Sequence, residues 1–170
     1  LPFLLSEALK LFQNDPDKKL ITESNEDFLK ETGSIKHYKY NDGFLRPPGV
    51  SKCMYDFWSG SSGATTPLRY NNNYRNFLYV TTGKVKLKLI PPHYSKYLNV
   101  KKDYDNCEFR SPVNPWDVAP AHRADFNKVK VLDIELEEGK LIYIPAYWLY
   151  SVNYDEISSI SVFYYRTYMN

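Results

Sequence analysis

The sequence predicts a mainly β protein with two N-terminal helices, built as a jelly roll or another closed fold of two sheets. Three observations support this. About eight strand-like runs joined by short turns follow one another from Met54 onward. Tyrosine and phenylalanine are abundant, with 16 and 9 copies in 170 residues, and aromatic side chains suit half-buried strands. The length fits one domain with a substantial core.

The chain before Met54 is predicted to be an extension of helices and short strands. Apolar residues recur on one helical face within the first dozen residues. Ser24 or Asn25 can cap a second helix, and Gly33 can end it. The expected elements are a helix over 4–12, a strand over 19–22, a helix from 25 to 33, a strand over 34–40 and a loop over 41–49.

The clearest hairpin joins strands over 75–82 and 84–90 across Gly83. Two sets of side chains alternate in its second strand: Lys84, Lys86 and Lys88, and Val85, Leu87 and Leu89. Because side chains alternate between the two faces of a strand, we predict that the lysines face solvent and the aliphatic residues are buried. A solvated lysine face also blocks edge pairing, and binding of an anion or nucleic acid there is the alternative.

Strand-like runs continue on both sides of this hairpin. The expected elements before it are strands over 54–58 and 65–70, separated by a Gly-Ser loop over 59–63. After it we expect a helical turn over 93–98, a long polar excursion over 99–128, and strands over 129–136, 141–145, 149–154 and 158–168.

Composition excludes several classes of protein. Lysine plus arginine exceeds aspartate plus glutamate by 22 to 20, and a net charge of +2 does not indicate nucleic acid or a membrane surface as the partner. The longest apolar run, 141–152, is too short to span a bilayer and contains Pro145. Cys53 and Cys107 form no CxxC motif, so we predict reduced thiols in an intracellular protein. The chain starts without Met and ends after a strand-like run, which is expected of a fragment of a longer chain.

Two stretches resemble the JmjC-type cupins. The first runs Gly-Ala-Thr-Thr-Pro-Leu-Arg-Tyr-Asn over 63–71 and is followed by Pro91-Pro92 after the hairpin. The second runs Leu-Glu-Glu-Gly-Lys-Leu-Ile-Tyr-Ile-Pro-Ala-Tyr-Trp over 136–148. The resemblance covers 54–168 and implies a double-stranded β-helix. It predicts a single cupin-like JmjC domain over 1–170, in which 1–53 is the extension and 54–168 is the barrel core.

Most members of that family are oxygenases that use iron and 2-oxoglutarate. Their metal is held by a His-x-Asp pair and a distal His, which the resemblance places here at Arg69, Asn71 and Tyr150. A guanidinium is cationic and repels a metal, and amide and phenol groups are poor substitutes for carboxylate and imidazole. Asn76 matches a residue that helps bind the oxoacid in some members, whereas the position of the oxoacid-binding lysine falls near Val85. We therefore predict no catalytic residue, no metal and no cofactor, and a vacated metal site or ligand pocket at Arg69, Asn71, Asn76 and Tyr150.

The remaining chemistry of the chain offers no second site. The three histidines, His37, His93 and His122, have no ligand spacing and are expected to be exposed or hydrogen-bonded. Tyr143 and Trp148, in the second motif, are predicted to be core residues.

The predicted function is non-catalytic. We interpret the chain as a pseudo-oxygenase, a cupin-like binding or structural module with a protein partner. The bias toward Asn, Lys and Tyr favours an AT-rich genome, so we expect a viral or protist assembly and an intracellular or virion-associated location. Two alternatives remain open: a divergent 2-oxoglutarate-dependent oxygenase with an unusual metal site, and a small-anion-binding cupin in which Arg69 grips a carboxylate or phosphate.

Overall fold

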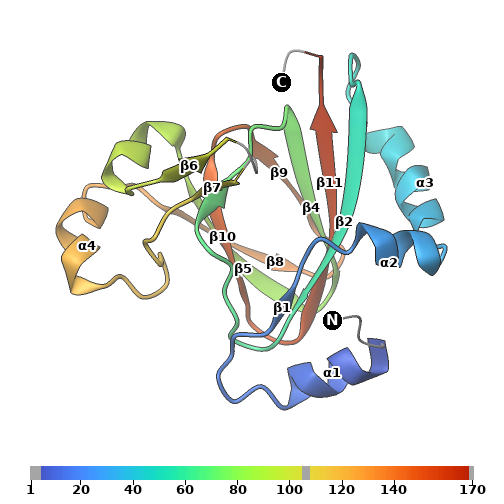
Figure 1. The fold of residues 1–170 in the computed structure, drawn as a ribbon, viewed down its shortest axis with the longest axis horizontal. Coiled ribbons are helices and arrows are strands. Elements are labelled where there is room, and N and C mark those ends of the chain that lie inside the picture. Colours follow the sequence, from blue (N-terminus) through green and yellow to red (C-terminus); the bar gives the residue numbers. More distant parts are fainter. Residues whose placement is uncertain (1–4, 105–107, 169–170) are drawn as a thin grey trace.

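The computed structural model describes residues 5–104 and 108–168, which form two packed antiparallel sheets with helices outside them (Figure 1). Sheet A has five strands in the order β1-β2-β11-β4-β9: Ile21–Thr22, Lys52–Gly60, Ser158–Arg166, Arg75–Thr82 and Leu141–Pro145. Sheet B has six in the order β6-β7-β3-β10-β5-β8: Lys101–Asp103, Glu108–Arg110, Arg69–Tyr70, Leu149–Tyr154, Lys84–Ile90 and Leu132–Glu137. The mainly β jelly roll predicted from the sequence is confirmed.

The helices lie outside this barrel. They are α1 (Leu5–Gln13), α2 (Glu26–Glu31), α3 (Ile35–Leu45), the 3-10 helix η1 (Pro92–Tyr97) and α4 (Pro120–Phe126). Helices α2 and α3 cover part of the outer face of sheet A, while η1 and α4 form a lobe beside sheet B together with the hairpin β6–β7 (Figure 1).

The sequence prediction was wrong over 34–49, where a strand and a loop were expected. This segment contains α3, so the described chain has three helices before the barrel instead of two. The reason is packing, because Tyr38 is buried against the rings of Tyr55 and Phe163, and Ser161 donates a 2.7 Å hydrogen bond to the Tyr38 hydroxyl. A helix over 35–45 brings Tyr38 to that surface, and the tertiary contact overrides the local turn signals.

Several predicted ranges need smaller corrections. Strands β4, β5, β9 and β10 match their predicted ranges residue for residue. The expected strand over 65–70 is reduced to β3, with a single bridge from Thr65 to Asn153 ahead of it. The excursion over 99–128 contains β6, β7 and α4, and the strand expected from 129 begins at Leu132.

The alternation in β5 is confirmed, although the Lys88 side chain lies against Trp116 and is only 18% exposed. Val85, Leu87 and Leu89 are all buried between the sheets, with relative exposures of 1%, 1% and 4%. The three lysines lie on the other face and pair with carboxylates: Lys84 with Glu135 at 3.0 Å, Lys86 with Asp155 at 2.8 Å and Lys88 with Asp133 at 2.6 Å. These ion pairs neutralise the basic face of β5.

The predictions for Tyr143, for Trp148 and for the two cysteines have different outcomes. Tyr143 is not a core residue, because it lies on the outer face of the edge strand β9 and is 44% exposed. Trp148 is partly buried and packs against the barrel core. Cys53 is a free thiol, with a pKa that burial raises, while Cys107 lies outside the described residues.

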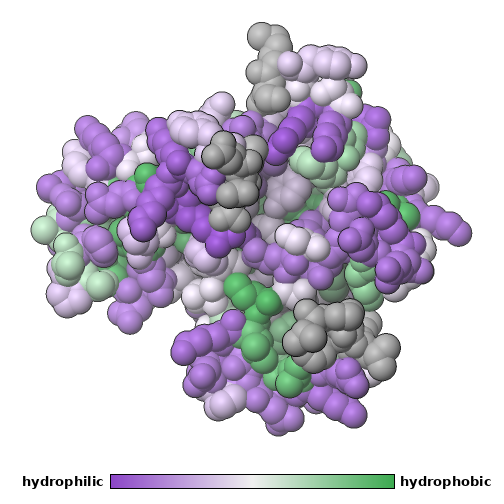
Figure 2. All heavy atoms as spheres, in the orientation of Figure 1, coloured by the Kyte–Doolittle hydropathy of each residue, from purple (hydrophilic) through white to green (hydrophobic). Residues whose placement is uncertain are grey.

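A groove runs beside the N-terminal helix. It has a volume of about 500 Å³ and is lined by residues of α1, β1, α2 and β2. Figure 2 shows hydrophobic residues gathered over this region, where Leu9, Leu11 and Leu20 are exposed. Within the described ranges, every helix is too short or too polar to cross a membrane.

Replacing Leu87 with alanine tests the alternation in β5. Leu87→Ala is expected to lower the free energy of unfolding by about 2–5 kcal/mol, because it leaves a cavity between the sheets. The neighbouring change Lys86→Ala is the matched control and should cost less than about 1 kcal/mol, since it removes one half-exposed ion pair. Urea denaturation measures both, and equal losses would contradict the assigned faces.

Candidate ligand site inside the barrel

Three of the four predicted site residues lie together. Arg69 on β3 is the direct cross-strand partner of Tyr150 on β10. Asn71 follows β3, and its side-chain amide donates a 3.0 Å hydrogen bond to the Tyr150 hydroxyl. The Arg69 guanidinium lies 5.8 Å from the centre of the Tyr150 ring. The expected convergence of Arg69, Asn71 and Tyr150 is therefore present.

Asn76 contacts a different set of residues. It lies on β4 in the opposite sheet and is buried. Its amide nitrogen donates to the Ile144 carbonyl at 3.3 Å, and its oxygen accepts from the Asn73 amide at 3.1 Å. Asn76 thus lines another wall of the same barrel.

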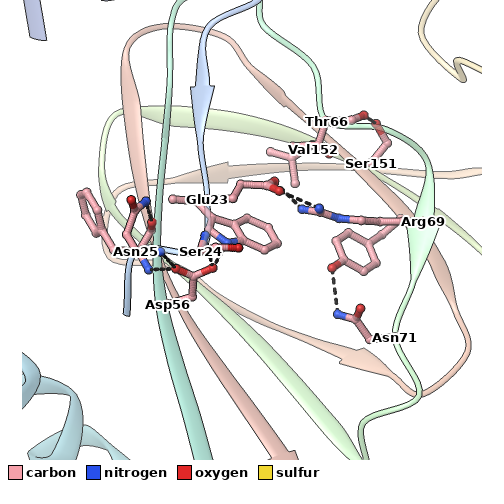
Figure 3. A network of polar contacts seen from close by, with 12 residues as sticks. Glu23, Ser24, Asn25, Asp56, Thr66, Arg69, Asn71, Ser151 and Val152 are labelled. Atoms are coloured by element: carbon pink, nitrogen blue, oxygen red, sulfur yellow. Dashed lines mark hydrogen bonds and ion pairs between the residues drawn. The ribbon is translucent and has the colours of Figure 1, made fainter. Parts of the chain in front are cut away.

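The Arg69 guanidinium is engaged by a carboxylate that the sequence analysis did not identify. Arg69 Nη1 donates to Glu23 Oε2 at 2.7 Å, and Arg69 Nη2 donates to Glu23 Oε1 (Figure 3). This two-pronged geometry is the strongest arrangement available to an arginine and a carboxylate. The side chains of Arg69 and Glu23 are only 12% and 22% exposed, so the pair is largely shielded from water.

Aromatic rings enclose the guanidinium. Its central carbon lies 4.7 Å from the centre of the Trp58 ring, and the Trp58 and Tyr150 rings stack at 6.5 Å with an interplanar angle of 12°. A cation near aromatic faces is stabilised by their electron density, and more so where water is excluded. The rings therefore hold Arg69 in place by packing as well as by charge.

Glu23 reaches the barrel because the chain around it is fixed to β2. Strand β1 pairs with the end of β2, and the carboxylate of Asp56 accepts hydrogen bonds from the backbone N–H groups of Ser24 at 2.9 Å and Asn25 at 2.6 Å. Ser24 has a φ of 60°, which turns the chain sharply after Glu23. Figure 3 shows Glu23 directed from this segment toward Arg69. We call residues 21–25 the Glu23 arm.

Asp56 also links the arm to the aromatic wall. Its Oδ2 atom accepts a 2.7 Å hydrogen bond from the Trp58 indole N–H. On the opposite side, Ser151 donates to the Thr66 carbonyl at 2.6 Å, and Val152 N–H donates to the Thr66 hydroxyl at 2.9 Å. These bonds fasten the segment that leads into β3, and so position Arg69.

The surroundings keep Arg69 charged and the nearby phenols neutral. Burial acts to lower the pKa of Arg69, but the opposing interactions with Tyr150 and Glu23 outweigh it and raise that pKa above its ordinary value. Burial raises the pKa values of Tyr154 and Tyr164. Two buried atoms in this region, Arg69 Nε and Tyr154 Oη, have no hydrogen-bond partner among the described residues.

The side chains of Arg69, Asn71 and Tyr150 do not fit the iron centre that the resemblance to JmjC-type cupins implies. The guanidinium of Arg69 offers no lone pair and is already bound by Glu23, and the Asn71 amide nitrogen is a hydrogen-bond donor to Tyr150. In the part of the chain that is described, no group of three or more His, Cys, Asp or Glu side chains is placed to hold a metal ion.

The other residues considered from the sequence lie away from this centre. His37, His93 and His122 belong to α3, η1 and α4, outside the barrel (Figure 1). Val85, near the expected position of the oxoacid-binding lysine, is buried in the apolar core.

Comparison with known proteins identifies the family. Residues 5–170 match the cupin-like domain, and the chain belongs to this family. Its fold is that of a JmjC-like cupin, as the two motifs had indicated.

The chain is similar in sequence to one curated relative and in structure to one solved protein. The chain is 28% identical over 119 residues to the protein named lysine-specific demethylase JMJ31 of Arabidopsis thaliana, covering 68% of this chain and 21% of that protein. The chain thus spans about a fifth of that relative's length. A crystal structure of a cupin superfamily protein from Desulfitobacterium hafniense DCB-2 aligns with a TM-score of 0.40 and 7% identity, over 68% of this chain and 69% of the other.

Glu23→Ala tests the importance of the buried ion pair. Removing one partner of such a pair typically costs about 3–5 kcal/mol, because the remaining charge is left uncompensated. Glu23→Ala should therefore lower the melting temperature, and added acetate or formate should restore part of the loss in a saturable manner. Differential scanning fluorimetry follows both effects.

Two controls make this rescue specific. Sodium chloride at the same ionic strength should not reproduce it. The double variant Glu23→Ala, Arg69→Met should not respond to acetate, because it lacks the cation. Equal rescue by chloride and acetate would contradict a carboxylate site at Arg69.

Proposed function

We propose that this protein is a non-catalytic cupin-like domain that acts as a binding or structural module for a protein partner. The observation that carries the proposal is the shielded ion pair between Arg69 and Glu23. A cation held by two hydrogen bonds and enclosed by aromatic rings stands where the resemblance puts the first metal-binding histidine. Function resides in the site rather than in the fold, so the fold of an oxygenase does not imply its activity.

The pairing of strands supports the proposed replacement of the metal ligands. Two ligands of one ion must lie side by side, and Arg69 and Tyr150 are direct cross-strand partners. Asn71 is hydrogen-bonded to Tyr150 and completes the set of three positions. The proposed vacated site therefore comprises Arg69, Asn71 and Tyr150, with Asn76 on the neighbouring wall of the barrel.

The arrangement of the Glu23 arm supports one further part of the proposal. The extension over 1–53 supplies the carboxylate that neutralises a cation of the barrel, and Asp56 of the barrel binds the backbone of the extension. We therefore treat 1–170 as a single domain in which the extension and the barrel depend on each other.

Binding of a small carboxylate or phosphate at Arg69 is the second candidate function. The structure favours a carboxylate as the chemical partner of Arg69, since Glu23 already occupies both of its terminal nitrogens. An external anion would have to displace the Glu23 arm, so this function is subordinate to the first.

Metal binding and turnover separate the proposal from an oxygenase. Purified protein incubated anaerobically with Fe(II) should retain no stoichiometric iron by elemental analysis. In the presence of oxygen and 2-oxoglutarate it should form no succinate above the level of a protein-free control. One iron per chain, or iron-dependent succinate formation, would contradict a non-catalytic domain.

A gain-of-binding variant serves as the matched control. This variant combines Glu23→Ala with three changes in the barrel: Arg69→His, Asn71→Asp and Tyr150→His. It removes the ion pair and supplies two imidazoles and a carboxylate at the three positions. Circular dichroism confirms that the variant is folded, and calorimetric titration with Co(II) should then show one site that the natural chain lacks. A folded variant with no Co(II) affinity would contradict the assignment of these positions.

A further inference from the structure

Part of the outer face of sheet A is left uncovered. Helices α2 and α3 pack over β2 and β11, where Leu29, Tyr38 and Phe163 are buried. The helical cover ends before β9, the last strand of this sheet. As a result Leu141 and Tyr143, which point outward from β9, are 42% and 44% exposed.

Helix α3 adds two aromatic side chains to this surface. Tyr40 and Phe44 are 73% and 79% exposed, and their rings contact each other at 5.8 Å. Phe44 and Leu141 line one cavity of about 250 Å³, between the end of α3 and the sheet. We call Tyr40, Phe44, Leu141 and Tyr143 the α3–β9 patch. Tyr40 contacts Phe44, Phe44 and Leu141 line the same cavity, and Leu141 and Tyr143 lie on one face of β9, so the four exposed side chains form a patch of the kind that marks a protein interaction site.

The backbone of β9 offers hydrogen-bonding groups beside the patch. Val80 N–H donates to the Lys140 carbonyl at 3.0 Å, so Lys140 faces β4. In an antiparallel ladder successive residues alternate in the direction of their N–H and C=O groups. Leu141 and Tyr143 therefore direct these groups toward the free edge of sheet A, within the described part of the chain. Pro145, which has no N–H, ends this edge.

The charge around the patch is positive. Helix α3 carries Lys36 and Lys39 on its surface, while its carboxylate, Asp42, is buried and bound to Arg46 at 2.5 Å. The Arg75 guanidinium lies 5.7 Å from the centre of the Tyr143 ring.

The turn before β9 contributes one charge of each sign, Glu138 and Lys140. The lysines of β5 are matched by carboxylates, whereas the exposed side chains of α3 include cations and no carboxylate. An acidic partner complements this surface.

We propose that the free edge of β9 and the α3–β9 patch bind an extended, acidic segment of a partner protein, which adds to sheet A as a further strand. The inference rests on the proposed binding role and specifies its location and the chemistry of the partner. Strand addition gives affinity through backbone hydrogen bonds, and side chains alternating along the segment reach the exposed rings. A second copy of this chain fits less well, since a twofold interface places the same cations opposite one another.

Fluorescence polarisation with synthetic peptides tests the proposal. The probes are fluorescein-labelled ten-residue peptides in which glutamate alternates with valine, leucine, phenylalanine or tyrosine. At least one should bind the natural chain saturably, and ten times more tightly than its counterpart with lysine in place of glutamate. N-methylation of alternate backbone nitrogens should weaken that binding at least tenfold, because it removes the hydrogen bonds of an added strand.

Variants then locate the binding. Leu141→Glu and Tyr143→Glu should each weaken it at least tenfold. Leu132 is a leucine of similar exposure on the edge strand β8 of sheet B, and Leu132→Glu should leave the binding unchanged. Overlapping circular dichroism melts verify that the variants fold.

Three results would overturn the inference. The first is that no peptide of the panel binds at 1 mM, a concentration at which even very weak binding is detected. The second is that Leu141→Glu and Leu132→Glu have equal effects, and the third is that the chain dimerises and Tyr143→Glu abolishes the dimer. None of these results bears on iron or succinate, so the proposed absence of catalysis stands or falls separately.

Discussion

The buried charge of Arg69 is the constraint on which the rest of the structure depends. A cation inside a barrel must be compensated, because desolvation without a partner costs several kcal/mol. Glu23 supplies the compensation, but it lies 46 residues earlier in the chain and must be carried to the site. Asp56 does this by binding two backbone N–H groups next to Glu23, and the same carboxylate orients Trp58 beneath the guanidinium. One ion pair thus links the extension, the first long strand and the centre of the barrel.

The barrel places its interior residues by alternation. Along β10 the side chains of Tyr150, Val152 and Tyr154 enter the core, and the residues between them point away from it. The same period of two explains the alternation of β5, whose aliphatic residues were correctly assigned from sequence. It also fixes Arg69 opposite Tyr150, whichever residue types occupy these two positions.

Local patterns predicted the fold well wherever the neighbouring strands reinforce them. Strands β4, β5, β9 and β10 could be bounded from alternation and turn residues alone. Helix α3 could not, because its Asn-Asp-Gly sequence is a turn signal and the contacts that make it helical come from Tyr55 and Phe163 on distant strands. Tyr143 was assigned to the core because the motif could not show that β9 is an edge strand.

The site was predictable in part. The family resemblance was sufficient to bring Arg69, Asn71 and Tyr150 together, but it gave no indication of Glu23, Asp56 or Trp58. Glu23 follows a strand of two residues and has no distinctive pattern around it. Asp56 did carry a signal: a single carboxylate within an apolar strand, at an inward-facing position, must find hydrogen-bond donors when it is buried. Pairing over such a distance in sequence is decided by the folded geometry rather than by local preference.

A buried ion pair is not the most stabilising way to fill a barrel, because well-packed apolar side chains often serve equally well or better. What the pair of Arg69 and Glu23 adds is position. Two matched hydrogen bonds hold Glu23 against Arg69, and the bonds to Asp56 hold the Glu23 arm against β2. Helix α2 begins at Glu26, directly after the Glu23 arm, and α3 follows it within a few residues. The ion pair therefore connects the interior of the barrel with the segment that leads directly into the helices on the outer face of sheet A.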